Sequence, residues 1–98
     1  MKGKNPAASR QESPWPSADA AQRDDLTGLP NRRYLVSRMQ DLSRKAAEER
    51  SLFCLILLDV DHFKRATQTF GERAGDALLK SLAGRLESVA SHHDCLVR

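Results

Sequence analysis

The fold is decided by residues 51–61, which read SLFCLILLDVD. The apolar part, residues 52–58, has the length of a β-strand, and its hydrophobicity is continuous rather than alternating. Continuous hydrophobicity is typical of a central strand that helices cover on both faces. We therefore expect residues 52–58 to form a buried strand, with the Cys54 side chain packed in the core.

Amphipathic helices are predicted on either side of this strand. Asn31 is a good N-cap, and the helix that follows it to about residue 50 carries an apolar stripe of Leu35, Met39, Leu42 and Ala46. A second helix is expected over residues 72–90 from the spacing of Leu78, Leu82, Leu86 and Val89. Gly71 separates it from one or two helical turns in residues 62–70, and residues 94–98 are expected to start another strand.

The order helix, strand, helix, strand predicts an α/β (α+β) domain with a crossover connection. The 98 residues of the chain suffice for one small domain. Three of the four prolines lie within residues 1–23. We expect this segment to be a disordered tail or linker that precedes a domain over residues 24–98.

Composition excludes several classes of protein. The net charge is only +3, and one Trp, one Tyr and three Phe do not suffice for a nucleic-acid-binding surface. The longest apolar run is far shorter than the roughly 20 residues of a membrane helix. No apolar segment follows the basic N-terminus as it would in a signal peptide. We therefore expect a cytoplasmic protein with no membrane segment, in which Cys54 and Cys95 are free thiols.

Two carboxylates, Asp59 and Asp61, follow the predicted strand and share one face, because side chains alternate along a strand. Carboxylates at the end of a buried strand are costly unless they are solvated, paired or bound to a cation. Oxygen ligands suit Mg²⁺ and the phosphates that it carries. Because Asp-x-Asp is a short pattern, metal binding and simple solvation both stay open. Lys64 either faces a phosphate or is an ordinary surface lysine.

Asp76 is expected in the first turn of the second helix, where a helix N-terminus stabilises negative charge by about 0.3–1 kcal/mol. Its role is either this structural one or the acceptance of hydrogen bonds from a ligand amidine. The three histidines are predicted to be surface residues rather than metal ligands, and they are His62, His92 and His93.

Together, these motifs resemble the GGDEF domain of diguanylate cyclases. The resemblance covers residues 24–98 and rests on DDLTGLPNRR at 24–33, LDVDHFK at 58–64, FGERAGDALL at 70–79 and DCLVR at 94–98. It implies a partial ferredoxin-like, palm-type domain related to nucleotide cyclases. Members of the family condense two GTP molecules into cyclic di-GMP at the interface of two such domains.

The resemblance also implies a role for several positions. In the family, the position of Asp59 binds Mg²⁺ or Mn²⁺, together with the backbone carbonyl at Val60. The positions implied to bind substrate are His62, Phe63 and Lys64 for the GTP phosphates, and Thr67 and Asp76 for the guanine.

Two of the motifs depart from the family pattern. Thr67-Gln68 stands where the family usually has Asn-Asp, and one hydroxyl cannot supply the paired donor and acceptor of an amide. Guanine selectivity is therefore in doubt. The inhibitory product-binding motif Arg-x-x-Asp would fall on residues 91–94, where Asp94 fits as a remnant and Ser91 does not.

The sequence reaches Arg98 just before the position of the Gly-Gly-Asp-Glu-Phe signature. We therefore expect a truncated GGDEF domain in which the strand at residues 52–58 lacks its neighbours and no catalytic residue is present beyond the metal ligand. GTP and a second GGDEF domain are the implied partners, and the 98 residues are predicted to be inactive alone. The alternative is a degenerate, non-catalytic module that binds nucleotide or a partner protein.

Overall fold

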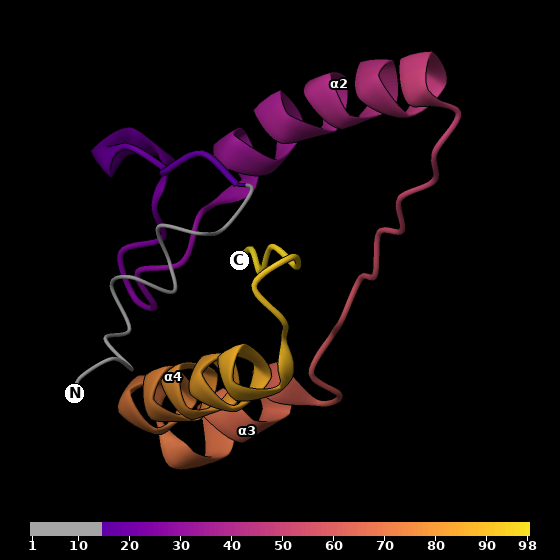
Figure 1. The fold of residues 1–98 in the computed structure, drawn as a ribbon. Coiled ribbons are helices and arrows are strands. Elements are labelled where there is room, and N and C mark those ends of the chain that lie inside the picture. Colours follow the sequence, from indigo (N-terminus) through magenta and orange to yellow (C-terminus); the bar gives the residue numbers. More distant parts are fainter. Residues whose placement is uncertain (1–14) are drawn as a thin grey trace, which may run out of the picture.

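The structure, a computed structural model, describes residues 15–98. It contains a short 3-10 helix, η1 (Ala20–Gln22), and three α-helices: α2 (Arg32–Glu49), α3 (Phe63–Phe70) and α4 (Glu72–Val89). Figure 1 shows α2 apart from the paired helices α3 and α4, with a long extended segment between them. The C-terminal residues lie between these two parts. Residues 1–14 of the predicted tail lie outside the described residues.

The helix expected after Asn31 is confirmed as α2. The Asn31 Oδ1 accepts a hydrogen bond from the Tyr34 N–H at 3.2 Å, which is the geometry of an N-cap. The helix is followed by its C-cap, Arg50, whose φ of 52° is left-handed and whose N–H donates to the Ala46 carbonyl. The predicted apolar stripe is half-buried, whereas basic residues occupy the exposed faces, namely Arg32, Arg33, Arg44 and Lys45.

The second predicted helix is confirmed as α4, and α3 pairs with it through a sharp turn at Gly71. That residue has a φ of 92°, a conformation that favours glycine. The two helices pack closely at Gly75, where an added Cβ would collide with the Thr67 methyl group and lie 3.3 Å from the Phe63 ring. Gly75 is buried for this reason, because only a residue without a side chain allows the helices to approach so closely.

The prediction of a buried strand at residues 52–58 is wrong. The segment is extended, but no backbone hydrogen bond joins it to any other part of residues 15–98. Leu52 and Leu57 are 99% and 93% exposed, and the Cys54 side chain is exposed rather than packed in a core. A strand needs a neighbour for its N–H and carbonyl groups. The described residues supply none.

The second predicted strand, residues 94–98, is also absent from the described part of the chain. This segment instead crosses to the loop before α2, where the Arg98 N–H donates to the Pro30 carbonyl at 2.9 Å. The pairing of Arg23 with Pro30 is an isolated bridge and not a sheet. The observed order is therefore helical, and the α/β (α+β) assignment is confirmed only for its helices.

The core of the described residues is small. Its buried side chains are Leu29 in the loop before α2, Tyr34 in the first turn of α2, and Ala83 in α4. The Tyr34 hydroxyl donates to the Pro16 carbonyl, and the Trp15 indole N–H donates to the His93 carbonyl at 2.8 Å. Residues 15–23 therefore contact the rest of the chain, while the domain boundary at residue 24 stays a prediction.

Candidate functional site

The first candidate site is the acidic turn, which we define as residues 59–62. It joins the extended segment to α3 and is closed by a hydrogen bond from the Phe63 N–H to the Val60 carbonyl at 3.3 Å. Asp59 and Asp61 are exposed and form no ion pair with any described residue. Because these carboxylates have no cationic side chain beside them, they can bind a cation from solution.

The start of α3 adds positive potential beside the acidic turn. His62 occupies the N-cap with a left-handed φ of 59° and makes no side-chain capping bond. The N–H groups at the start of a helix carry partial positive charge and bind anions when no side chain caps them. Lys64 and Arg65 are exposed in this first turn. Oxygen groups of the kind that a cation prefers therefore lie next to a helix end of the kind that suits an anion.

The acidic turn fits Mg²⁺ only in part. It offers the carboxylates of Asp59 and Asp61 and the Val60 carbonyl, which are the hard oxygen donors that Mg²⁺ prefers. Within residues 15–98, no group of three or more His, Cys, Asp or Glu side chains could enclose a metal ion. Waters or a bound phosphate would have to complete the octahedral shell that Mg²⁺ demands.

The second group of predicted site residues lies where α3 and α4 pack together. The Thr67 hydroxyl donates to the Lys64 carbonyl at 2.8 Å, and its methyl group faces Gly75. Asp76 follows Gly75 and is exposed. The acidic residue in the first turn of α4 is Glu72, so the expected position of Asp76 in that turn is wrong. The structure thus brings Thr67 close to the backbone next to Asp76.

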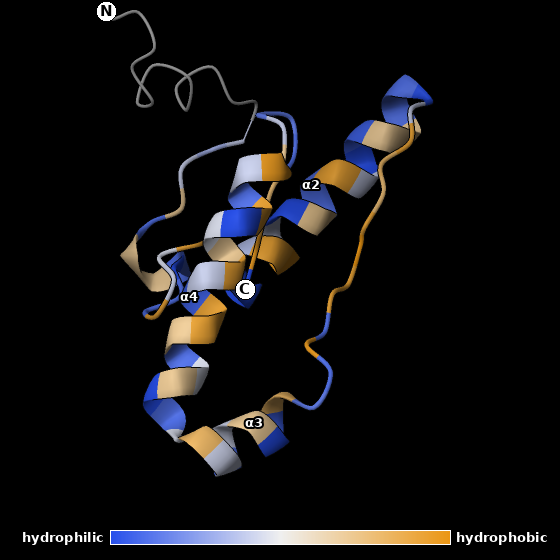
Figure 2. Cartoon of the chain, turned by 90° about the horizontal axis from the view of Figure 1, so that it is seen from below, coloured by the Kyte–Doolittle hydropathy of each residue, from blue (hydrophilic) through white to orange (hydrophobic). Residues whose placement is uncertain are grey.

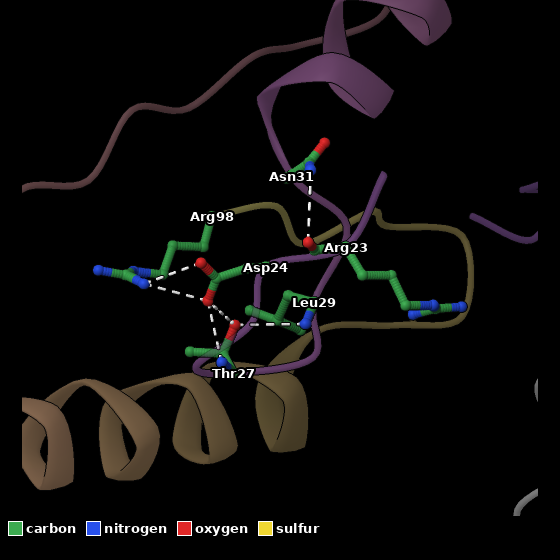
Figure 3. A network of polar contacts seen from close by, with 6 residues as sticks. All are labelled: Arg23, Asp24, Thr27, Leu29, Asn31 and Arg98. Atoms are coloured by element: carbon green, nitrogen blue, oxygen red, sulfur yellow. Dashed lines mark hydrogen bonds and ion pairs between the residues drawn. The ribbon is translucent and has the colours of Figure 1, made fainter. Parts of the chain in front are cut away.

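The most elaborate polar network is formed by residues without a predicted role, and Figure 3 shows it. The Asp24 Oδ2 accepts hydrogen bonds from the Thr27 N–H at 2.9 Å and from the Thr27 hydroxyl at 2.7 Å. The Arg98 guanidinium donates to the Asp24 Oδ1 and Oδ2 at 2.9 and 3.1 Å. This contact ties the C-terminal residues to the loop that precedes α2.

Backbone contacts complete this network. The Asp24 N–H donates to the Leu29 carbonyl at 2.7 Å, and the Leu29 N–H donates to the Thr27 hydroxyl at 3.2 Å. Burial raises the pKa of the Asp24 carboxyl, but the hydrogen bonds from Thr27, followed by those from Arg98, outweigh it and lower the pKa below its usual value. Asp24 is therefore ionised and held in place, which makes the network a structural connection rather than a proton donor.

One local signal in the sequence could have revealed this network. Asp followed three residues later by Thr is typical of a turn in which the carboxylate accepts hydrogen bonds from the backbone and the hydroxyl. Asp24 and Thr27 have that spacing. The contact with Arg98 joins residues 74 positions apart and has no such local signal.

Asp94 caps a turn that starts at Ser91. The Asp94 carboxylate accepts from the Ser91 N–H at 2.9 Å, and the Asp94 N–H donates to the Ser91 carbonyl at 3.0 Å. Residues 92–93 lie in this turn, and the rings of His92 and His93 are 3.9 Å apart between centroids. The carboxylate is thus engaged in holding the turn.

The cysteines are free, as expected. Cys95 lies on the segment that crosses to the loop before α2, and burial raises the pKa of its thiol. A raised pKa keeps the thiol protonated at neutral pH and lowers its nucleophilicity. Cys95 therefore adds no nucleophile to the candidate site.

A family model described as "Diguanylate cyclase, GGDEF domain" matches residues 21–98, which is most of the chain. The chain belongs to the GGDEF family. The match includes both Asp24 and Arg98, so the ion pair between them connects two segments of the GGDEF region. It also includes the acidic turn and the helices α3 and α4.

Three relatives match this GGDEF chain over a small share of their own length. Diguanylate cyclase DgcP of Pseudomonas aeruginosa is 43% identical over 76 residues, which cover 76% of this chain and 11% of the relative. Response regulator PleD of Caulobacter vibrioides is 39% identical, and the matched residues cover 74% of this chain and 16% of the relative. Diguanylate cyclase TpbB of P. aeruginosa is 33% identical, and the matched residues cover 83% of this chain and 19% of the relative. The GGDEF chain spans 11–19% of the length of these relatives.

No solved structure matches the GGDEF chain. Among residues 15–98, no helix has both the length and the hydrophobicity to cross a bilayer.

Proposed function

We propose that this GGDEF chain forms the GTP-binding part of a diguanylate cyclase domain. The observation that carries the proposal is the junction of the acidic turn with the uncapped start of α3. Two exposed carboxylates and an open helix N-terminus adjoin there, and Mg²⁺-bound triphosphate requires both kinds of partner. The domain that we propose covers residues 24–98 and acts in the cytoplasm, where GTP is available.

Two residues of the acidic turn hold the metal in this proposal. The Asp59 carboxylate and the Val60 carbonyl bind Mg²⁺, or Mn²⁺ in its place. The Asp61 carboxylate is exposed in the same turn. When bound, the metal neutralises charge on the triphosphate and favours attack by a 3′-hydroxyl group.

The start of α3 holds the phosphates in this proposal. The Phe63 N–H already donates to the Val60 carbonyl at 3.3 Å, so the N–H groups that follow it in this uncapped first turn bind the phosphates, and the exposed Lys64 ammonium adds positive charge. A helix N-terminus and one lysine together bind anions without fixing their identity. Specificity for GTP therefore has to come from the base.

The guanine contacts are proposed to come from Thr67 and Asp76. The exposed Asp76 carboxylate can accept hydrogen bonds from the two N–H groups along one edge of guanine. Thr67 contributes less, because its hydroxyl already donates to the Lys64 carbonyl at 2.8 Å. Base recognition in this chain therefore rests mainly on Asp76.

The remaining proposals concern product and partner. Condensation of two GTP molecules into cyclic di-GMP requires a second GGDEF domain that presents the other GTP. Asp94 is the remnant of an inhibitory product site, and this remnant is weak because the Asp94 carboxylate is engaged with the Ser91 N–H at 2.9 Å. A serine at position 91 also lacks the bidentate donors of arginine.

The test measures GTP binding and product formation with the purified 98-residue chain. We expect titration calorimetry to show GTP binding that requires Mg²⁺, and chromatography to show no cyclic di-GMP above a control without protein. Asp59→Asn should remove the Mg²⁺-dependent part of the binding. Asp25→Asn, which changes an exposed carboxylate outside the acidic turn, is the matched control and should not.

Two results would contradict the proposal. Unchanged GTP affinity in Asp59→Asn would show that the acidic turn does not hold the metal. Cyclic di-GMP formed by the chain alone, and lost in Asp59→Asn, would show that these residues form a complete catalytic site rather than part of one.

A further inference from the structure

We propose that residues 15–18 form a strap that connects the start of α2 to the turn at residues 91–94, which follows α4, and that the strap holds this turn closed. Its action requires neither GTP nor a metal ion. The apolar strip at residues 52–58, which joins α2 to α3 in Figure 2, takes no part in the contacts of the strap described below.

One contact docks the strap on α2. The Pro16 carbonyl accepts a hydrogen bond from the Tyr34 hydroxyl. Tyr34 lies in the first turn of α2 and is only 2% exposed, so its ring is fixed in the small core of the described residues. A buried hydroxyl is costly unless it forms a hydrogen bond. The strap therefore supplies the partner that this hydroxyl needs.

A second contact docks the strap on the turn. The Trp15 indole N–H donates to the His93 carbonyl at 2.8 Å. The peptide group that carries this carbonyl also carries the Asp94 N–H, which donates to the Ser91 carbonyl at 3.0 Å. Because a peptide group is planar, the indole fixes the orientation of the N–H that closes the turn. Trp15 thus stabilises the turn through its backbone.

The strap and the turn border one cavity. Its volume is about 640 Å³, and its lining includes Trp15 and Pro16 of the strap, Tyr34 of α2, and Ser91 and Asp94 of the turn. Side chains that line a void lack packing partners on that side. The hydrogen bonds of Trp15 and Tyr34 therefore carry much of the docking.

The segment after the strap is held by contacts of its own. The Asn31 N–H donates to the Gln22 carbonyl at 2.7 Å, and the Asn31 Nδ2 donates to the Ala21 carbonyl at 3.0 Å. The Asp19 N–H donates to the Gln22 Oε1 at 3.2 Å, which closes η1 on itself. Since these contacts do not involve residues 15–18, the strap can leave its docked position by rotation next to Asp19 while η1 stays attached.

The strap therefore transmits a displacement of the chain before η1 to the turn after α4. In the docked state, the Asp94 carboxylate accepts from the Ser91 N–H at 2.9 Å and the turn is closed. Loss of the strap removes the donor from the His93 carbonyl and loosens the turn, without any change in α2 or α4. The strap precedes residue 21, where the family match begins, so it consists of residues outside the family pattern.

The experiment measures hydrogen exchange of the 98-residue chain by NMR, with the Asp94 amide as the readout. Trp15→Ala should raise its exchange rate about fivefold, because the hydrogen bond that fixes its peptide group is lost. Tyr34→Phe keeps the ring and removes the hydroxyl, and it should raise the same rate about threefold. The Tyr34 hydroxyl donates to the strap and not to the turn, so this second effect has to pass through the strap.

Two comparisons separate the action of the strap from a general loss of stability. Ser88→Ala is the matched control, because it also removes a hydroxyl that donates to a backbone carbonyl, that of Arg85 at 2.6 Å, but outside the cavity. It should leave the Asp94 rate unchanged. In the double variant, Trp15→Ala with Tyr34→Phe, the rate should equal that of Trp15→Ala alone, since the connection to the turn is already broken.

Three outcomes would overturn the inference. An Asp94 rate that stays unchanged in Trp15→Ala or in Tyr34→Phe would show that the strap does not connect α2 to the turn. A rise of the same size in Ser88→Ala, or a loss of helical circular dichroism in the Tyr34 variant, would assign the effect to general destabilisation. A double variant that exchanges faster than Trp15→Ala would show two independent contacts instead of one strap.

Discussion

The Arg98 guanidinium holds both carboxylate oxygens of Asp24, at 2.9 and 3.1 Å, across 74 positions of the sequence. Asp24 is 17% exposed and Arg98 is 42% exposed, so the pair is partly shielded from solvent. The contact joins the segment after α4 to the loop before α2. It is the longest-range ion pair among the described residues.

Replacement of Arg98 should loosen the loop before α2. We expect Arg98→Gln to cost about 1 kcal/mol, since the pair is only half-buried. The amide protons of Thr27 and Gly28 should then exchange with solvent about fivefold faster, as measured by NMR. Arg85→Gln removes an exposed arginine of α4 that forms no ion pair in residues 15–98, and it should leave these rates unchanged.

The same carboxylate should make the loop sensitive to acid. The folded-state pKa of Asp24 is lowered, so its contribution is present above the unfolded value of about 3.9 and is lost as the pH falls through the folded value. We expect protection of the Thr27 amide to decline over this acid range. Asp24→Asn should abolish the decline and lower protection at neutral pH. A decline that persists in Asp24→Asn would assign it to another carboxylate.

The contact between α3 and α4 should be intolerant of any side chain at Gly75. We expect Gly75→Ala to destabilise the pair by about 1–3 kcal/mol, because the added methyl group collides with Thr67. Gly84→Ala is the control: its Cβ meets nothing within 4 Å, so it should raise helix stability by roughly 0.5–1 kcal/mol. Urea unfolding followed by circular dichroism measures the free energy of unfolding of the two variants. Equal effects would show that the helices do not pack as described.

Guanine selectivity should respond to residue 67. Within the proposed function, Thr67→Asn adds a side chain with both a donor and an acceptor, so we expect the preference for GTP over ATP to rise about threefold to tenfold. Competition binding with the two nucleotides measures it. Thr69→Asn, on an exposed position of the same helix, is the control. An unchanged preference for GTP over ATP in Thr67→Asn would show that residue 67 does not contact the guanine.

The helices were predictable because their signals are local. Asn31 caps α2 through a residue three positions away, and the half-buried stripe of α2 repeats every three or four residues. The turn at Gly71 likewise depends on one residue and its neighbours. Cap, stripe and turn are all contained in short windows of sequence, so no knowledge of distant contacts is needed.

The strand was not predictable in the same way. Continuous hydrophobicity at residues 52–58 indicates a preference for burial, but burial needs partners that lie elsewhere in space. The described chain has none, so Cys54 and its neighbours are exposed. The candidate site divides similarly: the acidic turn is visible as a pattern, whereas the pairing of Asp24 with Arg98 is visible only in three dimensions.

The hydrogen bond from the Trp15 indole to the His93 carbonyl gives the chain an internal optical reporter. Trp15 is the single tryptophan of the sequence, so its fluorescence comes from one place. The indole is half-buried there, and its release into water would shift its emission to longer wavelength. The emission maximum therefore reports, without any label, whether the segment before η1 is seated on the turn after α4.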